Sequence, residues 1–303
     1  MPATMASTGL DARGAWLVFG AAAIWSFGGA IARFLQVTDS WTIIFWRSLC
    51  AAVFLLGFML WRDGMRGTAR LFRDMGWAGI GVGLCFATAS TSFIVALSYT
   101  TVANILLMQA GAPLFAALMM FLLFRERVAA GTWVAIAAVM AGIAVMVSDS
   151  LDGSVSPVGD GLALLIALAF ATATVLTRRN AHLRMMPAVC LGTLVTLVAG
   201  FALAGSLRVG TADAAWLFVF GALNLALGMM CFVTGVRLLP AAVAALIGTA
   251  EPVLGPIWVW LVHGEVPLGR TLTGGAIVIG ALLVHLAWQM RQTRQPRIVP
   301  MAD

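Results

Sequence analysis

The sequence predicts an all-α integral membrane protein of ten transmembrane helices, built as two inverted repeats of five helices each. Three observations predict this fold. First, 62% of the 303 residues are hydrophobic and only 10% are charged, whereas soluble domains carry about 25% charged residues. Second, ten apolar stretches reach the roughly 20 residues that a spanning helix needs. Third, a shift of 139 residues aligns part of the second half with the first.

The ten stretches follow one another with short breaks, so we expect no domain outside the membrane. Charged residues gather in the breaks, most clearly at Arg62–Met75. We expect two units, at 14–148 and 159–290, with polar cytoplasmic tails at 1–12 and 292–303. In chain order, the predicted spans are 14–34, 41–61, 76–97, 103–124, 130–148, 159–178, 187–206, 213–236, 241–262 and 270–290.

The basic residues predict the orientation of the bundle. All 18 of them are Arg. If the N-terminus is inside, fourteen lie on the inner side, whereas only Arg33, Arg208 and Arg270 lie on the outer side, as the positive-inside rule requires. We therefore expect both termini in the cytoplasm and the chain in the cell inner membrane. The same distribution accounts for the net charge of +6 without a nucleic-acid partner.

The internal repeat is clearest around two prolines. The 139-residue shift pairs Pro113 with Pro252. It also pairs Glu126 with Glu265. Each unit therefore has a helix interrupted by Pro and an acidic residue just past its end, and we interpret these four residues as structural. Because each unit has five helices, the second starts on the opposite side of the membrane, and inverted repeats of this kind are typical of secondary transporters.

After each Pro…Glu segment comes a helix with small residues four positions apart. Ala137 and Ala141 in the first unit align with Ala276 and Gly280 in the second. Small residues at this spacing let helix backbones approach closely in lipid. They could pack the fifth and tenth helices together or join protomers. The oligomeric state stays open, and a monomer is compatible with the sequence.

These motifs, in this order, resemble the EamA-type branch of the drug/metabolite transporter superfamily across nearly the whole chain. The likeness rests on AAAIWSFGGAIAR in the first span, IIFWRSLCAAVF in the second, and the two Pro…Glu segments. Within that family, the chain is most similar to the YddG-type exporters of amino acids. The resemblance implies a basket in which helices 1, 3, 4, 6, 8 and 9 surround a central cavity, with helices 5 and 10 behind.

Several side chains on the implied cavity helices are candidates for contact with a substrate. Aromatic rings could form an apolar wall for the side chain of the substrate, or they could be interfacial anchors. The amides could orient an ammonium or carboxylate group, or they could join helices. The expected lining residues are Trp25, Phe86, Ser90, Met108, Gln109, Phe170, Thr174 and Asn224.

Two ionisable residues, Glu251 and Arg47, lie inside predicted spans. Each is a candidate functional residue, because charge at membrane depth is costly and often functional. Glu251 could couple transport to protons, or it could be a structural acid that bonds backbone groups freed by Pro252. The structural interpretation is favoured, since the family motif has Glu here across unrelated substrates. Arg47 could attract a substrate carboxylate. A structural role is favoured, with a loop carbonyl or Asp39 as partner, because the second span is not expected to line the cavity.

The sequence therefore favours a secondary transporter that exports amino acids of broad specificity, neutral and aromatic ones among them, by alternating access. An exporter of other small metabolites or drugs, or a flippase of lipid-linked substrates, is the alternative. An enzyme is not expected, since no nucleophile–base motif is present, and neither is a metal site, since the three His residues are scattered. We expect no cofactor and no ATP-binding loop. The expected partners are the small-molecule substrate and the lipid bilayer.

Overall fold

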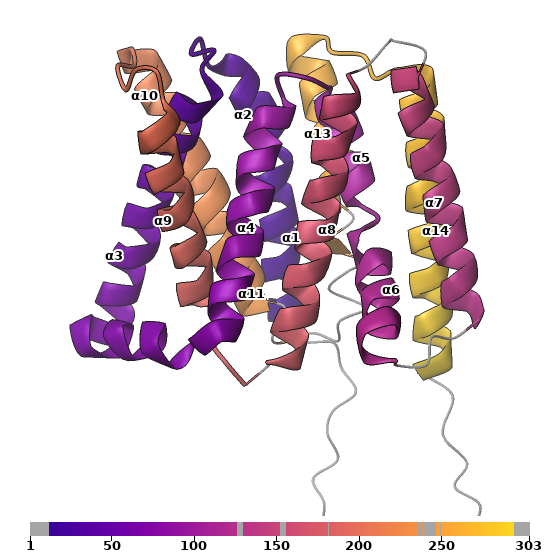
Figure 1. Cartoon of the computed structure of the whole chain (residues 1–303), viewed down its shortest axis with the longest axis horizontal. Helices are drawn as coiled ribbons and strands as arrows, with labels where there is room; N and C mark the ends of the chain where they lie inside the picture. The colour runs from indigo at the N-terminus through magenta and orange to yellow at the C-terminus, as the bar shows by residue number, and fades with distance from the viewer. Residues whose placement is uncertain are drawn as a thin grey trace, which may run out of the picture.

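A computed structural model describes residues 12–125, 130–151, 156–180, 182–235, 238, 247–248 and 250–293, and these are almost entirely helical (Figure 1). Glu126 and nearly all of both predicted tails lie outside the described residues. The helices are α1 (Ala12–Ser26), α2 (Gly28–Phe34), α3 (Ser40–Asp74), α4 (Gly76–Ala96), α5 (Val102–Gln109), α6 (Ala112–Phe124), α7 (Ala130–Leu151), α8 (Pro157–Arg179), α9 (Met186–Leu203), α10 (Thr211–Phe218), the π-helix η1 (Val219–Ala226), α11 (Leu227–Gly235), α13 (Ala250–His263) and α14 (Gly269–Thr293).

Length and composition identify the helices that can cross a membrane. Six qualify outright, and a seventh is formed if the bent pair of α5 and α6 counts as one span. Shorter apolar helices lie at Ala130–Met146 and Gly269–His285. The predicted helical membrane fold is therefore confirmed with six clear spans, while the count of ten and the inverted repeat stay predictions. The six are Ala12–Phe34, Ser40–Asp74, Gly76–Ala96, Pro157–Thr177, Met186–Leu203 and Thr211–Gly235.

The segment Arg62–Met75, predicted as a break between two spans, is itself helical, because the helix α3 continues to Asp74. Its direction changes at Gly64, whose φ of 68° lies in the left-handed region that glycine adopts without a steric penalty. Beyond Gly64 the helix runs across one face of the molecule instead of through it (Figure 1). Charge can end a membrane span without ending the helix, because a helix can continue along the membrane surface.

The prolines of the two units stand at the start of helical segments. The fourth predicted span divides into α5 and α6, bent by 44°, and Pro113 lies in the first turn of α6, where its missing N–H costs no hydrogen bond. Helix α13, which holds Pro252, ends at His263, and Gly264 follows with a φ of 67°. Arg125 ends α6 with a φ of 52°. Arg125 and Gly264 are 139 positions apart, the spacing of the sequence repeat.

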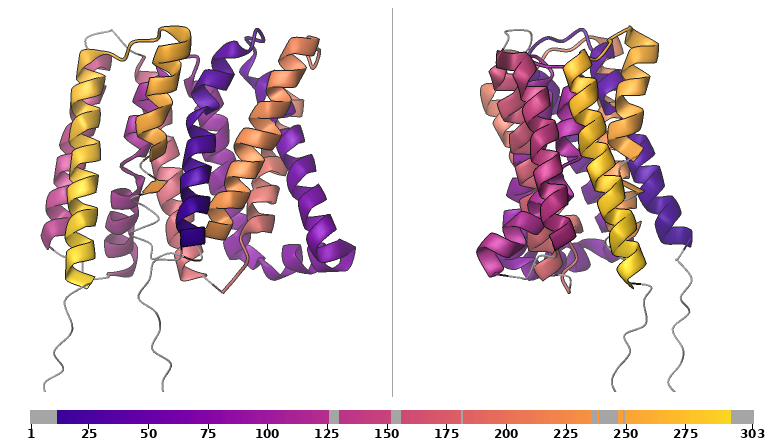
Figure 2. Two further views of the ribbon diagram at one scale, coloured as in Figure 1. Left: turned by 180° about the vertical axis from the view of Figure 1, so that it is seen from behind. Right: turned by 90° about the vertical axis from the view of Figure 1, so that its right-hand side faces the viewer.

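Helices α7 and α14 pack along each other at one end of the bundle (Figures 1 and 2). Their closest approach is at Gly142 and Gly274, because a Cβ on Gly142 would lie 2.7 Å from the carbonyl oxygen of Gly274. The predicted small pairs are not at this contact. Ala137, Ala141 and Ala276 are exposed. The contact is instead made by Gly142, one residue after Ala141, and by Gly274, two residues before Ala276, since successive helical residues point about 100° apart.

The molecule has two opposite faces at the ends of its helices. The terminal face holds the start of α1, the end of α14 and the α3 segment beyond Gly64 (Figure 2). The loop face holds the connections at 35–39, 97–101, 204–210 and 264–268 (Figure 1). Helices α4, α8 and α9 run between these faces, and α4 packs against both of the others.

Candidate functional site

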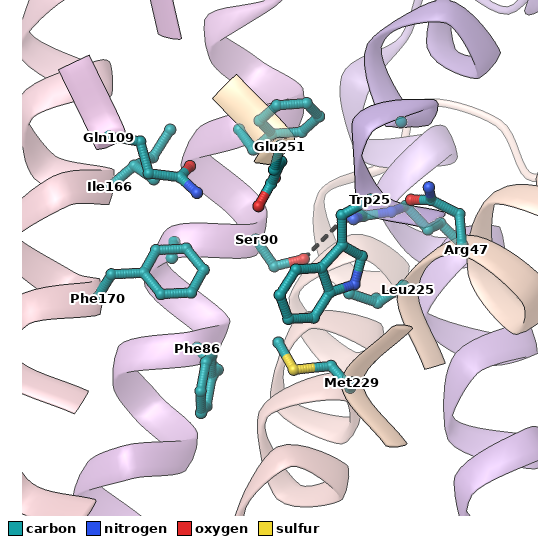
Figure 3. Close-up of a pocket in the computed structure, with 14 residues that line it drawn as sticks. Trp25, Arg47, Phe86, Ser90, Gln109, Ile166, Phe170, Leu225, Met229 and Glu251 are labelled. Atoms are coloured by element: carbon teal, nitrogen blue, oxygen red, sulfur yellow. Dashed lines mark hydrogen bonds between the residues drawn. The ribbon is translucent and has the colours of Figure 1, made fainter. Parts of the chain in front are cut away.

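A cavity lies at the centre of the bundle, among helices that are far apart in the chain (Figure 3). Its volume is about 70 Å³, enough for a few water molecules and small beside the 300–1,000 Å³ common for ligand pockets. The lining is mixed, with aromatic, amide, hydroxyl and charged groups. It consists of Trp25, Gly28, Arg47, Phe86, Ala89, Ser90, Phe93, Gln109, Ile166, Phe170, Asn224, Leu225, Met229 and Glu251.

Most of the expected lining residues are brought together at this cavity, namely Trp25, Phe86, Ser90, Gln109, Phe170 and Asn224. Met108 and Thr174 do not line it. Met108 is fully buried in the apolar core, because α5 turns its neighbour Gln109 to the cavity and one residue of rotation points Met108 elsewhere. The exposed Thr174 donates its hydroxyl hydrogen bond to the carbonyl of Phe170, 2.8 Å away, a common arrangement for Thr inside helices.

Aromatic rings line the cavity from two opposite sides. Phe86 of α4 and Phe170 of α8 meet edge to face with 5.8 Å between ring centroids. Trp25 of α1 lies opposite them in Figure 3 and contacts Phe232 at 5.2 Å. Gly228 of α11 makes room for the indole, since a Cβ there would overlap the Trp25 ring. These three rings, Trp25, Phe86 and Phe170, are called the aromatic wall below.

The two amides at the cavity differ in how they are bonded. Asn224 of η1 is buried and donates to the carbonyl of Ile24, close to the break between α1 and α2. The side chain of Gln109 makes no hydrogen bond to a described residue and points into the cavity (Figure 3). Asn224 therefore joins helices, whereas Gln109 is available to a ligand.

Arg47 lines the cavity from α3, the helix that was expected to lie outside it. Its side chain is only 6% exposed. One terminal nitrogen, Nη1, donates to Ser90 Oγ at 2.8 Å, and the guanidinium lies 4.4 Å from the centre of the Phe220 ring. The Nε atom is buried without a hydrogen-bond partner among the described residues. Arg47 thus reaches the cavity as a cation whose only described partners are neutral.

The expected partner of Arg47, Asp39, is engaged elsewhere. Its carboxylate caps α3 by accepting from the backbone N–H groups of Trp41 and Thr42, at 3.1 and 3.2 Å. It also accepts from the Thr42 hydroxyl and from the N–H of Gly205. Burial by itself raises the pKa of Asp39, but these hydrogen bonds outweigh it and hold the pKa below its ordinary value. The structural explanation for Arg47 that relies on Asp39 is therefore wrong.

Glu251 lines the same cavity from the first turn of α13. Figure 3 shows its carboxylate pointing into the space between Gln109 and Ser90. Within the described part of the chain it forms no ion pair or hydrogen bond, so no bond to backbone groups freed by Pro252 is present there.

Glu265 takes part in a cluster of contacts that joins the two units across the loop face. Its Oε2 atom accepts from Arg33 Nε at 3.0 Å, and its Oε1 atom accepts from the N–H of Val102 at 3.2 Å. Next to this pair, Phe34 stacks on Trp216 with 4.5 Å between centroids. The acidic residue after α13 thus connects α2, α5 and the loop that follows α13.

A second cavity, of about 490 Å³, opens on the loop face. Its lining, which includes Arg33, Val37 and Ser98, comes only from residues 32–43 and 94–98. No metal site accompanies either cavity, since no group of three His, Cys, Asp or Glu in the described residues is placed to hold an ion.

Comparison with known proteins supports the family suggested by the sequence. The model of the EamA-like transporter family matches residues 12–148 and 157–287. No curated protein matches the chain. Among 18 matching chains of solved structures is a crystal structure of a protein with a TM-score of 0.65 and 17% identity, covering 94% of this chain and 98% of that one, which supports the fold alone. The chain belongs to the EamA-like transporter family and is, as its membership implies, a multi-pass membrane transporter of small substrates and not an enzyme.

Proposed function

We propose that the chain is a secondary transporter that exports amino acids from the cytoplasm by alternating access through the central cavity. The observation that carries this proposal is the composition of that cavity. Its lining comes from both family-matched segments and combines an aromatic wall with a free amide and two ionisable groups. Apolar pockets with a few convergent polar groups are the usual form of small-molecule sites, and amino acids need both kinds of surface.

The proposal includes ten transmembrane helices in two inverted units, 14–148 and 159–290, in the cell inner membrane. Both termini are cytoplasmic. The arginines support this orientation, because Arg66, Arg70 and Arg73 lie on the same face as the described ends of the chain (Figure 1), as the positive-inside rule requires of the cytoplasmic side. A reporter fused to the C-terminus and active only in the cytoplasm tests it, and activity of a periplasmic reporter there would contradict it.

Transport in proteoliposomes tests the function. Purified protein is reconstituted, and counterflow of labelled phenylalanine, leucine, alanine and glutamate is measured with and without a pH gradient. We expect saturable counterflow of neutral and aromatic amino acids in protein-containing vesicles and none in empty ones. If drugs or nucleosides are transported and no amino acid is, the amino-acid cargo is wrong and the alternative, an exporter of other small metabolites or drugs, is favoured. Movement of labelled lipid-linked sugar between leaflets would favour the flippase.

A further inference from the structure

The charges at the central cavity are opposite in sign and do not meet. Arg47 and Glu251 both line it, yet no ion pair joins them in the described structure. Buried charges are normally paired, because an unpaired ion away from water loses several kcal/mol of hydration. An arginine without a counter-charge and an acidic side chain without a partner, both lining one cavity, therefore indicate a ligand that supplies a partner to each.

The guanidinium of Arg47 is suited to a carboxylate. It has five N–H donors, and the described structure uses one nitrogen, Nη1, on the neutral hydroxyl of Ser90. Its position is fixed by that bond and by the Phe220 ring, so the fork is oriented before a ligand arrives. A fork held in this way matches a carboxylate by two parallel hydrogen bonds.

Glu251 is suited to an ammonium group for the complementary reason. An ammonium has three N–H donors and no acceptor, and Glu251 offers two oxygens that no described group occupies. Figure 3 places its carboxylate and the free amide of Gln109 on the same side of the cavity. The amide oxygen of Gln109 can accept a further hydrogen from the same ammonium.

We propose that Arg47 and Glu251 bind the carboxylate and the ammonium of one zwitterionic α-amino acid and thereby select zwitterions over simple amines and acids. The cavity, about 70 Å³ in this structure, widens in the transport cycle, and the aromatic wall then receives the side chain. This inference rests on the proposed function and specifies what the site recognises. An amine leaves Arg47 unpaired and an acid leaves Glu251 unpaired, and a buried polar group left without its partner is what rejects an analogue most strongly.

Three ligands that share a phenyl ring on a short chain test the pair Arg47 and Glu251, called the zwitterion clamp. L-phenylalanine carries both groups, 2-phenylethylamine lacks the carboxylate, and 3-phenylpropanoate lacks the ammonium. Binding to the purified full chain is measured from the rise of the unfolding temperature with ligand concentration, which yields each dissociation constant. We expect phenylalanine to bind at least about tenfold more tightly than either analogue.

Two variants make the test specific to each charge. Arg47→Gln should abolish the preference for phenylalanine over the amine and keep the preference over the acid. Glu251→Gln should do the reverse. If the neutral variants do not fold, Arg47→Lys and Glu251→Asp replace them, and because each changes the geometry of the group but keeps its charge, each should reduce the same preference by a smaller factor. Arg208→Gln removes an exposed arginine of the loop face and should leave all three constants unchanged.

The outcomes separate this inference from the proposed function. If phenylalanine is transported but the amine or acid binds equally well, or if each variant weakens all three ligands alike, the clamp is wrong and the exporter stands. If neither binding nor transport of any amino acid is found while other solutes are moved, the amino-acid function itself is wrong. The crossed pattern of preferences supports both.

Discussion

Two arginines of the first unit differ in their relation to the acidic residues of the second unit: Arg33 pairs with one, and Arg47 does not. Arg33 is partly exposed on the loop face and pairs with Glu265 at 3.0 Å. Arg47 is buried at the cavity, contacts only neutral groups, and lies across the space from an unpaired Glu251. Arg33 and Glu265 partner each other and so join helices, whereas we attribute the missing partners of Arg47 and Glu251 to a ligand. The contrast explains why ion pairing, and not charge alone, separates structural from binding groups here.

The largest expected effect comes from disturbing the contact between α3 and η1 that positions Arg47. A Cβ on Gly221 would overlap the backbone carbonyl of Arg47, and backbone cannot move aside as a side chain can. Gly221→Ala should therefore destabilise the protein by about 1–3 kcal/mol or more, measured as a lower unfolding temperature in detergent. Gly57→Ala, on an open side of α3, is the matched control and should leave stability unchanged or raise it.

The next prediction separates a binding role of Arg47 from a structural one. Replacement of a buried charged group by an apolar residue of similar size is often neutral or stabilising by about 1–4 kcal/mol. Arg47→Met should therefore keep or raise the unfolding temperature while it abolishes amino-acid transport, a trade-off common at functional sites. A marked fall in the unfolding temperature would mean that Arg47 has a structural role and holds the helices together.

A third prediction concerns the cap of α3 on the loop face. Asp39→Asn removes the negative charge at the N-terminus of α3 and should cost about 0.3–1 kcal/mol at pH 7. Because the folded pKa of Asp39 is lowered, its contribution is complete above the unfolded pKa of about 3.9 and is lost as the pH falls below that value. The unfolding temperature of Asp39→Asn should therefore lie below that of the unchanged protein at pH 7, and this difference should shrink as the pH falls below 4. Asp74→Asn, which removes an exposed carboxylate at the end of α3, is the control and should leave the unfolding temperature at pH 7 unchanged.

The smallest effect is expected from the ion pair between Arg33 and Glu265. Arg33 and Glu265 are partly exposed, and exposed pairs contribute about 0.2–1 kcal/mol. A double-mutant cycle with Arg33→Gln and Glu265→Gln should give a coupling energy in that range, reduced by added salt. A coupling well above it would mean that the loop face excludes water at this pair and would weaken the contrast with Arg47.

Much of the site could be predicted from the sequence. Trp25, Phe86, Gln109, Phe170 and Asn224 were placed at one cavity because the family resemblance specified which helices line it, and the structure brings them together there. Helical periodicity was the weak point. Met108 and Gln109 are neighbours in the chain, and only the packed orientation of α5 decides which of them meets the cavity and which the core.

The sequence by itself determined the membrane environment, the six clear spans and the break between α5 and α6 near Pro113, because hydropathy and local backbone chemistry act over a few residues. The tertiary structure decided the rest. It turned α3 along the surface at Gly64, moved the contact of α7 and α14 to Gly142 and Gly274, and brought Arg47 to the cavity opposite Glu251. Those outcomes depend on which helix faces meet across more than a hundred residues of chain, and no local pattern contains that information.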